Sequence, residues 1–227
     1  MKKLATAVLS LALVTFASSA FAANAVRISQ VYGGGGSASA AYVNDYVEIF
    51  NNSGVAVDIS GWTIEYGSAT GNWGSSALNI FTFPQGTFIQ PCKYILVALS
   101  GGGGGDPLPV APDFTGTNTL SGTTGKVGLF NTVQANVPCG SEAAGTLVDK
   151  VSYGTGNCPE VTNVPGLSSL TAAIRKLGGV QDTDVNLNDF TVEGSFAPHN
   201  SASPANTLCL ATPTAPTTWG SVKNIYR

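Results

Sequence analysis

The sequence is poor in histidine and in charged residues, and both scarcities exclude classes of protein. A zinc site needs several cysteine or histidine ligands, but His199 is the only histidine and no Cys-x-x-Cys pair occurs. Lysine and arginine number 10 against 13 acidic residues, so the basic surface that binds nucleic acid or anionic lipid is missing. We therefore expect neither nucleic acid nor a lipid surface as a partner.

Catalytic motifs are missing as well. The glycine runs at 33–36 and 101–105 lack the Gly-Lys-Ser/Thr ending of a phosphate-binding loop, and we predict that they form flexible loops. A serine hydrolase would place His199 beside a nucleophile and an acid, but no Gly-x-Ser-x-Gly nucleophile elbow precedes it. We therefore expect a protein that is not an enzyme and needs no cofactor.

Long apolar runs are absent beyond the N-terminus, so we expect no transmembrane segment. The N-terminus itself predicts a signal peptide over residues 1–22. Lys2 and Lys3 precede an apolar run at 4–16, and the small residues at 19–22 suit a signal peptidase. An uncleaved anchor is the alternative, but the run is short for a membrane span. We expect an exported protein, extracellular or at the cell surface, with the periplasm as an alternative.

Four cysteines occur, and an even number in an exported chain indicates two disulfides. Cys139 and Cys158 flank one hairpin-like segment and close a short loop, so we predict that they pair. Cys92 is then left for Cys209, which would fasten the C-terminal end to the body of the domain. The sequence alone permits three pairings.

Glycine and short alternating runs are abundant. With 28 glycines and 43% hydrophobic residues, the composition is that of a loop-rich but ordered β protein. Trp62, Ile64 and Tyr66 share one face, and we expect Trp62 in the core. The strand-like runs, separated by Gly, Pro and Asn, predict a sandwich or barrel rather than βαβ units; they lie at 25–32, 45–51, 55–59, 62–66, 79–83, 93–99, 126–131 and 147–153, with a last apolar run at 171–177.

Glu48 lies between Tyr46 and Phe50 on a largely apolar face of the run at 45–51. A buried carboxylate needs a cation or several hydrogen bonds. We predict a structural ion pair with Arg27 or Arg175, in preference to a role as a catalytic acid.

The acidic stretch near the C-terminus is a candidate calcium site. Its oxygen-bearing residues occupy positions 1, 3, 5, 7 and 12 of an EF-hand-like loop. Leu187 replaces the usual glycine at position 6, and no flanking helices are evident, so structural Asx-turns are the alternative that these departures favour. The candidate ligands are Asp182, Asp184, Asn186, Asn188 and Glu193.

Two aromatic residues and the C-terminus complete the candidates. Trp73 and Tyr42 lie in loops near glycine runs, where they would stack on sugars or meet a protein, or else anchor the loops over the core edge, which is the commoner outcome. Residues 210–218 form a Pro/Thr linker, and residues 219–227 form a short tail with helical spacing of apolar residues. We expect the tail to be either a sorting or anchoring signal or a helix that docks on the sandwich.

Several motifs in order resemble the lamin-tail domain of secreted bacterial proteins. The resemblance covers 25–209 and implies an all-β, immunoglobulin-like β-sandwich with long Gly-rich loops. It also implies a non-catalytic module, found alone or fused to nucleases, phosphatases or adhesive domains. Two positions depart from the pattern, because Val180 stands where a cysteine is frequent and Cys92 where glycine is commoner. The motifs are ISQVYGGGG at 28–36, NDYVEIFN at 44–51, ISGW at 59–62, GKVGLF at 125–130, VDKVSYG at 148–154, AIRK at 173–176, DTDVNLNDF at 182–190 and PHNSASP at 198–204.

Three functions follow as hypotheses. The first is a secreted, non-catalytic binding or surface-interaction module whose partner is a protein or glycan at the cell surface. The second is a structural component of the surface or matrix that assembles with itself. The third, a metal-dependent hydrolase, would need histidine ligands that this sequence does not offer.

Overall fold

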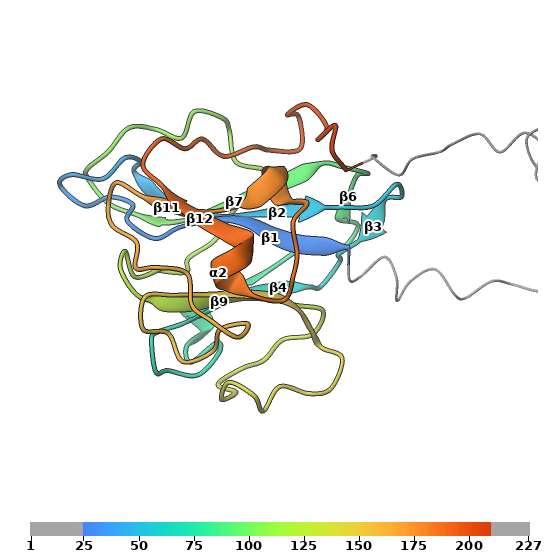
Figure 1. The fold of residues 1–227 in the computed structure, drawn as a ribbon, viewed down its shortest axis with the longest axis horizontal. Coiled ribbons are helices and arrows are strands. Elements are labelled where there is room, and N and C mark those ends of the chain that lie inside the picture. The colour runs from blue at the N-terminus through green and yellow to red at the C-terminus, as the bar shows by residue number, and fades with distance from the viewer. Residues whose placement is uncertain (1–24, 210–227) are drawn as a thin grey trace, which may run out of the picture.

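The structure, a computed structural model, describes residues 25–209. The predicted signal peptide at 1–22, the linker at 210–218 and the tail at 219–227 lie outside the described residues. Two sheets pack face to face (Figure 1). The larger has the order β12-β11-β1-β2-β7-β8, with β12 (Phe190–Glu193), β11 (Ala172–Arg175), β1 (Val26–Tyr32), β2 (Asn44–Asn51), β7 (Tyr94–Gly101) and β8 (Phe114–Thr115).

The smaller sheet has the order β10-β9-β4-β5, and a two-stranded sheet pairs β3 with β6. The described residues include one α-helical turn, α2 (Asn186–Asp189), so the predicted all-β, immunoglobulin-like sandwich is confirmed. The bounds are β10 (Leu147–Tyr153), β9 (Gly125–Phe130), β4 (Thr63–Gly67), β5 (Ile80–Thr82), β3 (Val57–Asp58) and β6 (Phe88–Ile89), with 3-10 turns η1 (Ala77–Asn79) and η2 (Lys176–Gly179).

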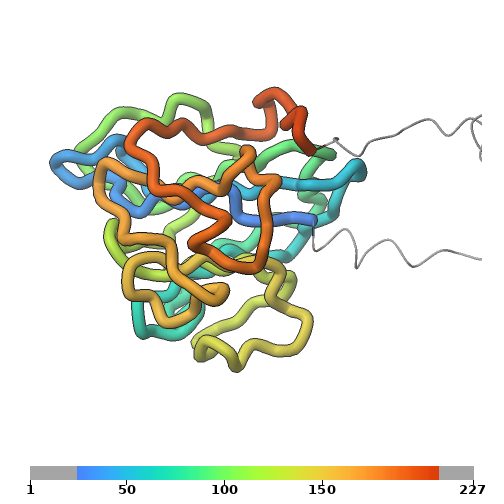
Figure 2. The backbone as a smooth tube through the Cα atoms, in the orientation of Figure 1, coloured from blue at the N-terminus to red at the C-terminus, as the bar shows by residue number. Residues whose placement is uncertain are grey.

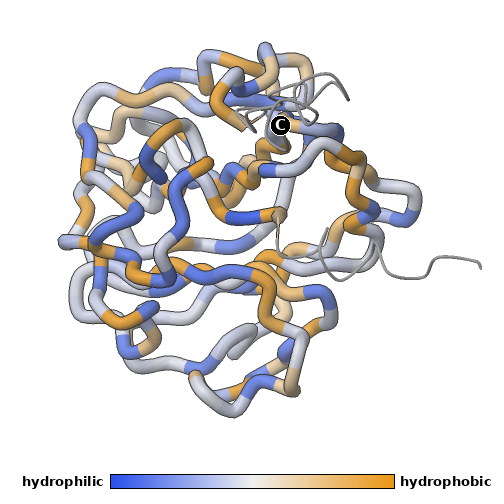
Figure 3. Tube along the Cα trace, turned by 45° about the vertical axis from the view of Figure 1, so that its right-hand side comes forward, coloured by the Kyte–Doolittle hydropathy of each residue, from blue (hydrophilic) through white to orange (hydrophobic). Residues whose placement is uncertain are grey.

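Alternation along the strands builds the core between the sheets. Val47 and Ile49 of β2 point into it, as do Trp62 and Ile64 at the start of β4, so Trp62 is a core residue as expected. Hydrophobic and hydrophilic residues intersperse along the chain (Figure 3). Within residues 25–209 no helix is long and apolar enough to cross a membrane.

A C-terminal segment, residues 194–209, crosses the outer face of the larger sheet (Figure 2). The Tyr42 hydroxyl donates to the carbonyl of Phe196 at 2.7 Å, and the Gln30 amide donates to Ala197 at 3.1 Å. Tyr42 packs there against Tyr32, Tyr46 and Phe196, so it belongs to an aromatic cluster of the domain. The other face of β2 is therefore covered by protein as well.

Two disulfides fasten the loops. Cys139 pairs with Cys158, with a Cα–Cα distance of 5.8 Å, and Cys92 pairs with Cys209 at 5.6 Å, which is the pairing expected from the sequence. Cys92 has a φ of 55°, in the left-handed region that glycine adopts most readily. Glycine, which the resemblance leads us to expect at this position, would adopt this conformation with less strain.

Trp73 lies under the loops that cover the smaller sheet. It is fully buried against Phe130 and Cys158, and its indole N–H donates to Glu142. The ammonium group of buried Lys126 lies 5.3 Å from the centre of its ring. Trp73 therefore anchors loops and is not exposed for stacking on a sugar.

The two glycine runs pack against each other, although they were expected to be flexible loops. Gly104 donates its N–H to the carbonyl of Gly36 at 3.2 Å. A Cβ atom on Gly36, which has a φ of +72°, would lie 2.1 Å from the backbone nitrogen of Gly102, and one on Gly104 would lie 2.0 Å from the carbonyl oxygen of Ser37. Close approach of two backbones therefore accounts for the glycines.

Replacing Gly36 with alanine should lower the free energy of unfolding by about 2 kcal/mol or more, because the new methyl group clashes with backbone and the φ is strained. Gly54→Ala is the matched control, since no atom lies within 4 Å of the added Cβ and its φ is not positive. Chemical denaturation of both variants measures the difference. Equal stabilities would contradict the close-approach explanation.

Candidate functional site

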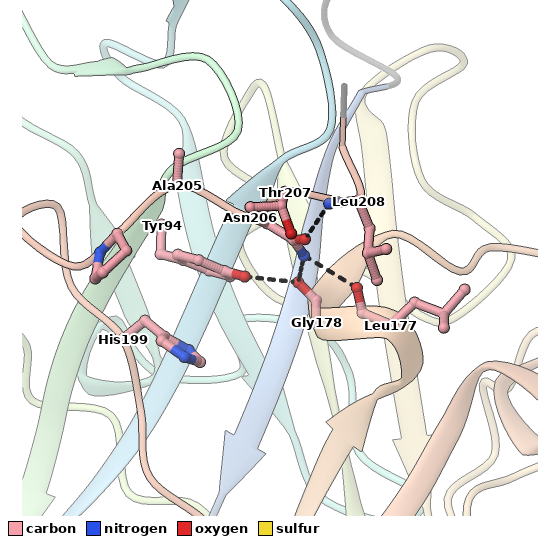
Figure 4. A pocket seen from close by; sticks show the side chains of 9 residues that line it. Tyr94, Leu177, Gly178, His199, Ala205, Asn206, Thr207 and Leu208 are labelled. Atoms are coloured by element: carbon pink, nitrogen blue, oxygen red, sulfur yellow. Dashed lines mark hydrogen bonds between the residues drawn. The ribbon is translucent and has the colours of Figure 1, made fainter. Parts of the chain in front are cut away.

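A surface pocket of about 460 Å³ lies where β7, η2 and the C-terminal segment meet. Figure 4 shows Tyr94 and His199 on one side of it, with Leu177 and Leu208 at the opposite rim. The lining contains the only histidine of the chain and no carboxylate. The pocket thus joins an apolar rim to a single ionisable basic group.

Behind His199 lies the buried Glu48 carboxylate, which is 1% exposed. The Ser29 hydroxyl donates to its Oε1 at 2.5 Å, and the backbone N–H of His199 donates to its Oε2 at 2.5 Å. The Nδ1 of His199 lies 3.2 Å from the same Oε2. Hydrogen bonds from Ser29 and His199, which are distant in the chain, therefore compensate the burial of the Glu48 carboxylate.

The prediction that Glu48 pairs with Arg27 or Arg175 is wrong. The β1–β2 register puts Gln30 opposite Glu48 and Arg27 opposite Phe50, and a bulge separates the two pairs. Arg27 and Arg175 instead extend toward the acidic stretch, where both contact Asp182. The residue opposite Glu48 on β1 is the neutral Gln30. The ionisable group in contact with the Glu48 carboxylate is His199, which follows Glu48 by 151 positions in the chain.

His199 stacks on Tyr94, with ring centres 4.5 Å apart and planes inclined by 20°. The hydrogen bond to Glu48 raises the pKa of His199, while partial burial lowers it, and the net direction is upward. Tyr94 also contacts Phe50, at 4.8 Å between ring centres, and donates its hydroxyl to the carbonyl of Gly178 at 2.9 Å. Burial raises the pKa of Tyr94 to about 12, so it stays neutral near pH 7.

Ser29, Glu48 and His199 do not form a catalytic triad. In a triad the histidine lies between the serine and the acid, because it removes the proton from the serine hydroxyl. Here the Ser29 hydroxyl bonds to Glu48, and Ser29 is 1% exposed. The arrangement holds an imidazole in place and offers no accessible nucleophile.

The rim of the pocket carries backbone strain. Leu177 adopts the left-handed conformation, with φ 56° and ψ 30°, and it is 56% exposed. Its carbonyl accepts from the Asn206 amide at 3.0 Å, and the same amide donates to Gly178 at 2.9 Å. Asn206 is itself fixed, because its N–H donates to the carbonyl of Cys92 at 2.9 Å. Leu208, the other rim leucine, is 47% exposed.

The acidic stretch is used differently from a calcium loop. Asn186 is fully buried, and its Oδ1 accepts from the N–H of Ser152 at 3.0 Å and of Glu160 at 3.2 Å. Its amide donates to the carbonyl of Lys150 at 3.0 Å. The side chain thus pairs with the edge of β10 as a neighbouring strand would, and its oxygen is not free for an ion.

Arg175 organises the remaining acids. Its guanidinium lies 2.7 Å from Asp149, 3.2 Å from Asp182 and 3.8 Å from Asp189. Arg175 is therefore a buried ion-pair residue, but its partners are these three aspartates and not Glu48, which the sequence predicted. Burial, followed by the charge of Asp149, raises the pKa of nearby Glu160 to about 8.

Of the three acidic candidates, Asp182 alone shares a group with the Glu160 and Asp189 carboxylates, whose oxygens lie within 4.8 Å of one another. The Asn186 amide donates to Glu160 at 2.8 Å. Asp184, Asn188 and Glu193 are exposed and lie outside that group. Calcium binding by this stretch stays a prediction, and Arg175 already supplies positive charge to these carboxylates.

Sequence reasoning missed the rim and the floor of the pocket. Tyr94, Leu177 and the pair Asn206 and Leu208 come from three separate parts of the chain, so no local pattern joins them. One signal was present: Leu177 precedes two glycines, a composition typical of a tight turn.

Comparisons with known proteins connect the fold to a family. The family model described as the lamin tail domain matches residues 19–155. A solved DUF4876 family protein from Bacteroides thetaiotaomicron is similar at 11% identity, over 80% of this chain and 72% of that chain, with a TM-score of 0.49. No curated protein matches the chain. The matched residues include Tyr94, whereas the other residues of the pocket follow the match.

The pKa of His199 should exceed 6.5 and should fall when Glu48 is replaced with glutamine, because the hydrogen bond to the carboxylate raises it and burial lowers it. Since the folded-state pKa is raised, the stability that protonation contributes is present below the unfolded-state pKa and is lost as pH rises through the folded-state pKa. Nuclear magnetic resonance of an untagged chain reports this residue alone. Glu193→Gln is the control, and an unchanged pKa in Glu48→Gln would count against the pairing.

Asn186→Ala should lower the free energy of unfolding by about 1–3 kcal/mol, because buried groups on β10 lose their hydrogen-bond partners. Asn188→Ala is the matched control, since its side chain is exposed and makes no hydrogen bond within residues 25–209. Thermal unfolding in the absence of calcium compares them. Similar losses in both variants would refute the strand-edge role.

Proposed function

We propose that this chain, which belongs to the lamin tail domain family, is an exported, non-catalytic module that binds a partner at the cell surface through the pocket beside His199. The observation that carries the proposal is Leu177, an exposed leucine held in the left-handed conformation at the pocket rim. The partner contributes an apolar group that packs between Leu177 and Leu208.

The strain at Leu177 supports a role in binding. A left-handed conformation costs a leucine on the order of 1–2 kcal/mol, and glycine or asparagine would adopt it at lower cost. Exposure of the leucine side chain to water gives no compensating burial. Both costs are offset when a partner covers Leu177 and Leu208, so the rim is suited to recognition.

The attachment of the C-terminal segment supports a preformed pocket. The Cys92–Cys209 disulfide holds the end of the segment, and the Glu48 carboxylate fixes His199 earlier in it. Between them the Asn206 amide donates to two consecutive carbonyls of η2, those of Leu177 and Gly178. A site fixed in advance loses less conformational entropy when a ligand binds.

Different observations support the proposed export and the proposed lack of catalysis. Two disulfides suit an oxidising compartment outside the cytosol. The Ser29 hydroxyl is 1% exposed and donates to Glu48, so it is not placed to act as a nucleophile activated by His199. Both observations favour a secreted binding module over a hydrolase.

Leu177→Asp should reduce binding at least about tenfold, because a charge replaces apolar contact at the rim. Aspartate tolerates the left-handed conformation, so the fold is expected to remain intact. Binding of the mature chain to an array of glycans, peptides and peptidoglycan fragments is the measurement. Leu78→Asp, at a leucine 64% exposed and outside the pocket, is the control. A signal that survives Leu177→Asp would exclude the pocket as the binding site.

A further inference from the structure

We infer that the ligand of this pocket carries a carboxylate beside an apolar group, and that binding requires the protonated imidazole of His199. The inference rests on the proposed function of the pocket and adds the class of ligand and its dependence on pH. It follows from the position of one imidazole between a buried carboxylate and the cavity.

The orientation of the imidazole supplies the carboxylate-binding group. Nδ1 faces Glu48, while Nε2 has no hydrogen-bond partner among residues 25–209. The side chain of His199 is 43% exposed, and the ring lines the pocket. Stacking on Tyr94 fixes the plane of the ring. Protonated His199 therefore directs an N–H donor with positive charge toward the cavity.

The apolar rim supplies the second part of the specificity. Leu177 and Leu208 line the same cavity as His199, together with Pro204. No carboxylate lines the pocket to repel an anion. The complementary ligand is accordingly a short acid with an aliphatic group, such as an acylated apolar amino acid with a free carboxylate.

The surrounding charges make the effect of protonation large. Glu48 of β2 is the carboxylate in contact with His199, and Tyr94 of β7 is neutral. Lys93, beside Tyr94, directs its ammonium to the carbonyl of Ser203, and Asp113 accepts hydrogen bonds from Ser201. When His199 loses its proton, the Glu48 carboxylate carries the only charge of the pair and repels an anionic ligand.

The sign of the pH dependence follows from this pair. The hydrogen bond to Glu48 raises the pKa of His199, so the protonated form persists above the ordinary histidine range. Below the folded-state pKa the pocket accepts the carboxylate. Above it, the apparent dissociation constant rises about tenfold for each pH unit, because the binding-competent fraction falls by that factor.

The experiment titrates the full, untagged chain with three probes while the imidazole signals of its only histidine are observed by nuclear magnetic resonance. N-acetyl-L-leucine carries both features, N-acetyl-L-leucinamide lacks the carboxylate, and acetate lacks the apolar group. Below the pKa of His199, we expect N-acetyl-L-leucine to shift the signals more strongly than the other two probes do. Above that pKa, its apparent dissociation constant should rise about tenfold for each pH unit. Leu177→Asp should abolish this shift, and Leu78→Asp should keep it.

The outcomes separate the two proposals. If N-acetyl-L-leucine and N-acetyl-L-leucinamide bind equally at every pH, the inference fails and the proposed pocket stands. If none of the probes shifts the signals, or if Leu177→Asp leaves the shift intact, both fail. His199→Gln keeps a donor without the charge, and it should bind N-acetyl-L-leucine weakly and without pH dependence. Should that variant not fold, the titration of the unaltered chain decides the question by itself.

Discussion

Burial of the Glu48 carboxylate is the constraint that joins the domain to its C-terminal segment. A buried carboxylate without partners costs several kcal/mol, so the chain must bring donors to it. Ser29 comes from the neighbouring strand, but His199 comes from 151 positions away and supplies both its backbone N–H and its ring. Satisfying one charge thus positions the segment that forms one side of the pocket.

Two further interactions hold the C-terminal segment, residues 194–209, in place. The Cys92–Cys209 disulfide holds its end, and Asn206 bonds to the turn that contains Leu177. Cys92 accepts a left-handed backbone to make this link, at a position where glycine is less strained. Both left-handed residues are therefore tied to this segment, Cys92 by the disulfide and Leu177 by the hydrogen bond from Asn206, and these links maintain the strain.

The periodicity of the sequence predicted the sandwich, because alternation is a local property of each strand. It located β2 and placed Trp62 in the core, and it identified Glu48 as a buried acid. It missed β12, whose residues were assigned to an acidic loop. It offered Asn186 as a calcium ligand or an Asx-turn residue, whereas the side-chain amide of Asn186 pairs with a strand edge. Partners that meet across the sheet depend on register, which composition does not contain.

Contacts between distant segments, which a local reading of the sequence does not contain, also decide the role of the glycine runs and of the pocket. Gly36 and Gly104 look like flexible loops when each is read alone, yet together they allow two backbones to touch. Likewise His199 has no motif around it, but the fold places it over Glu48, where it is the ionisable basic group of a pocket with an apolar rim. Apart from Tyr94, the residues that line this pocket follow the family match. Function in this chain is expected where the distant segment crosses the sheet, since an ionisable histidine, a strained leucine and a cavity coincide there.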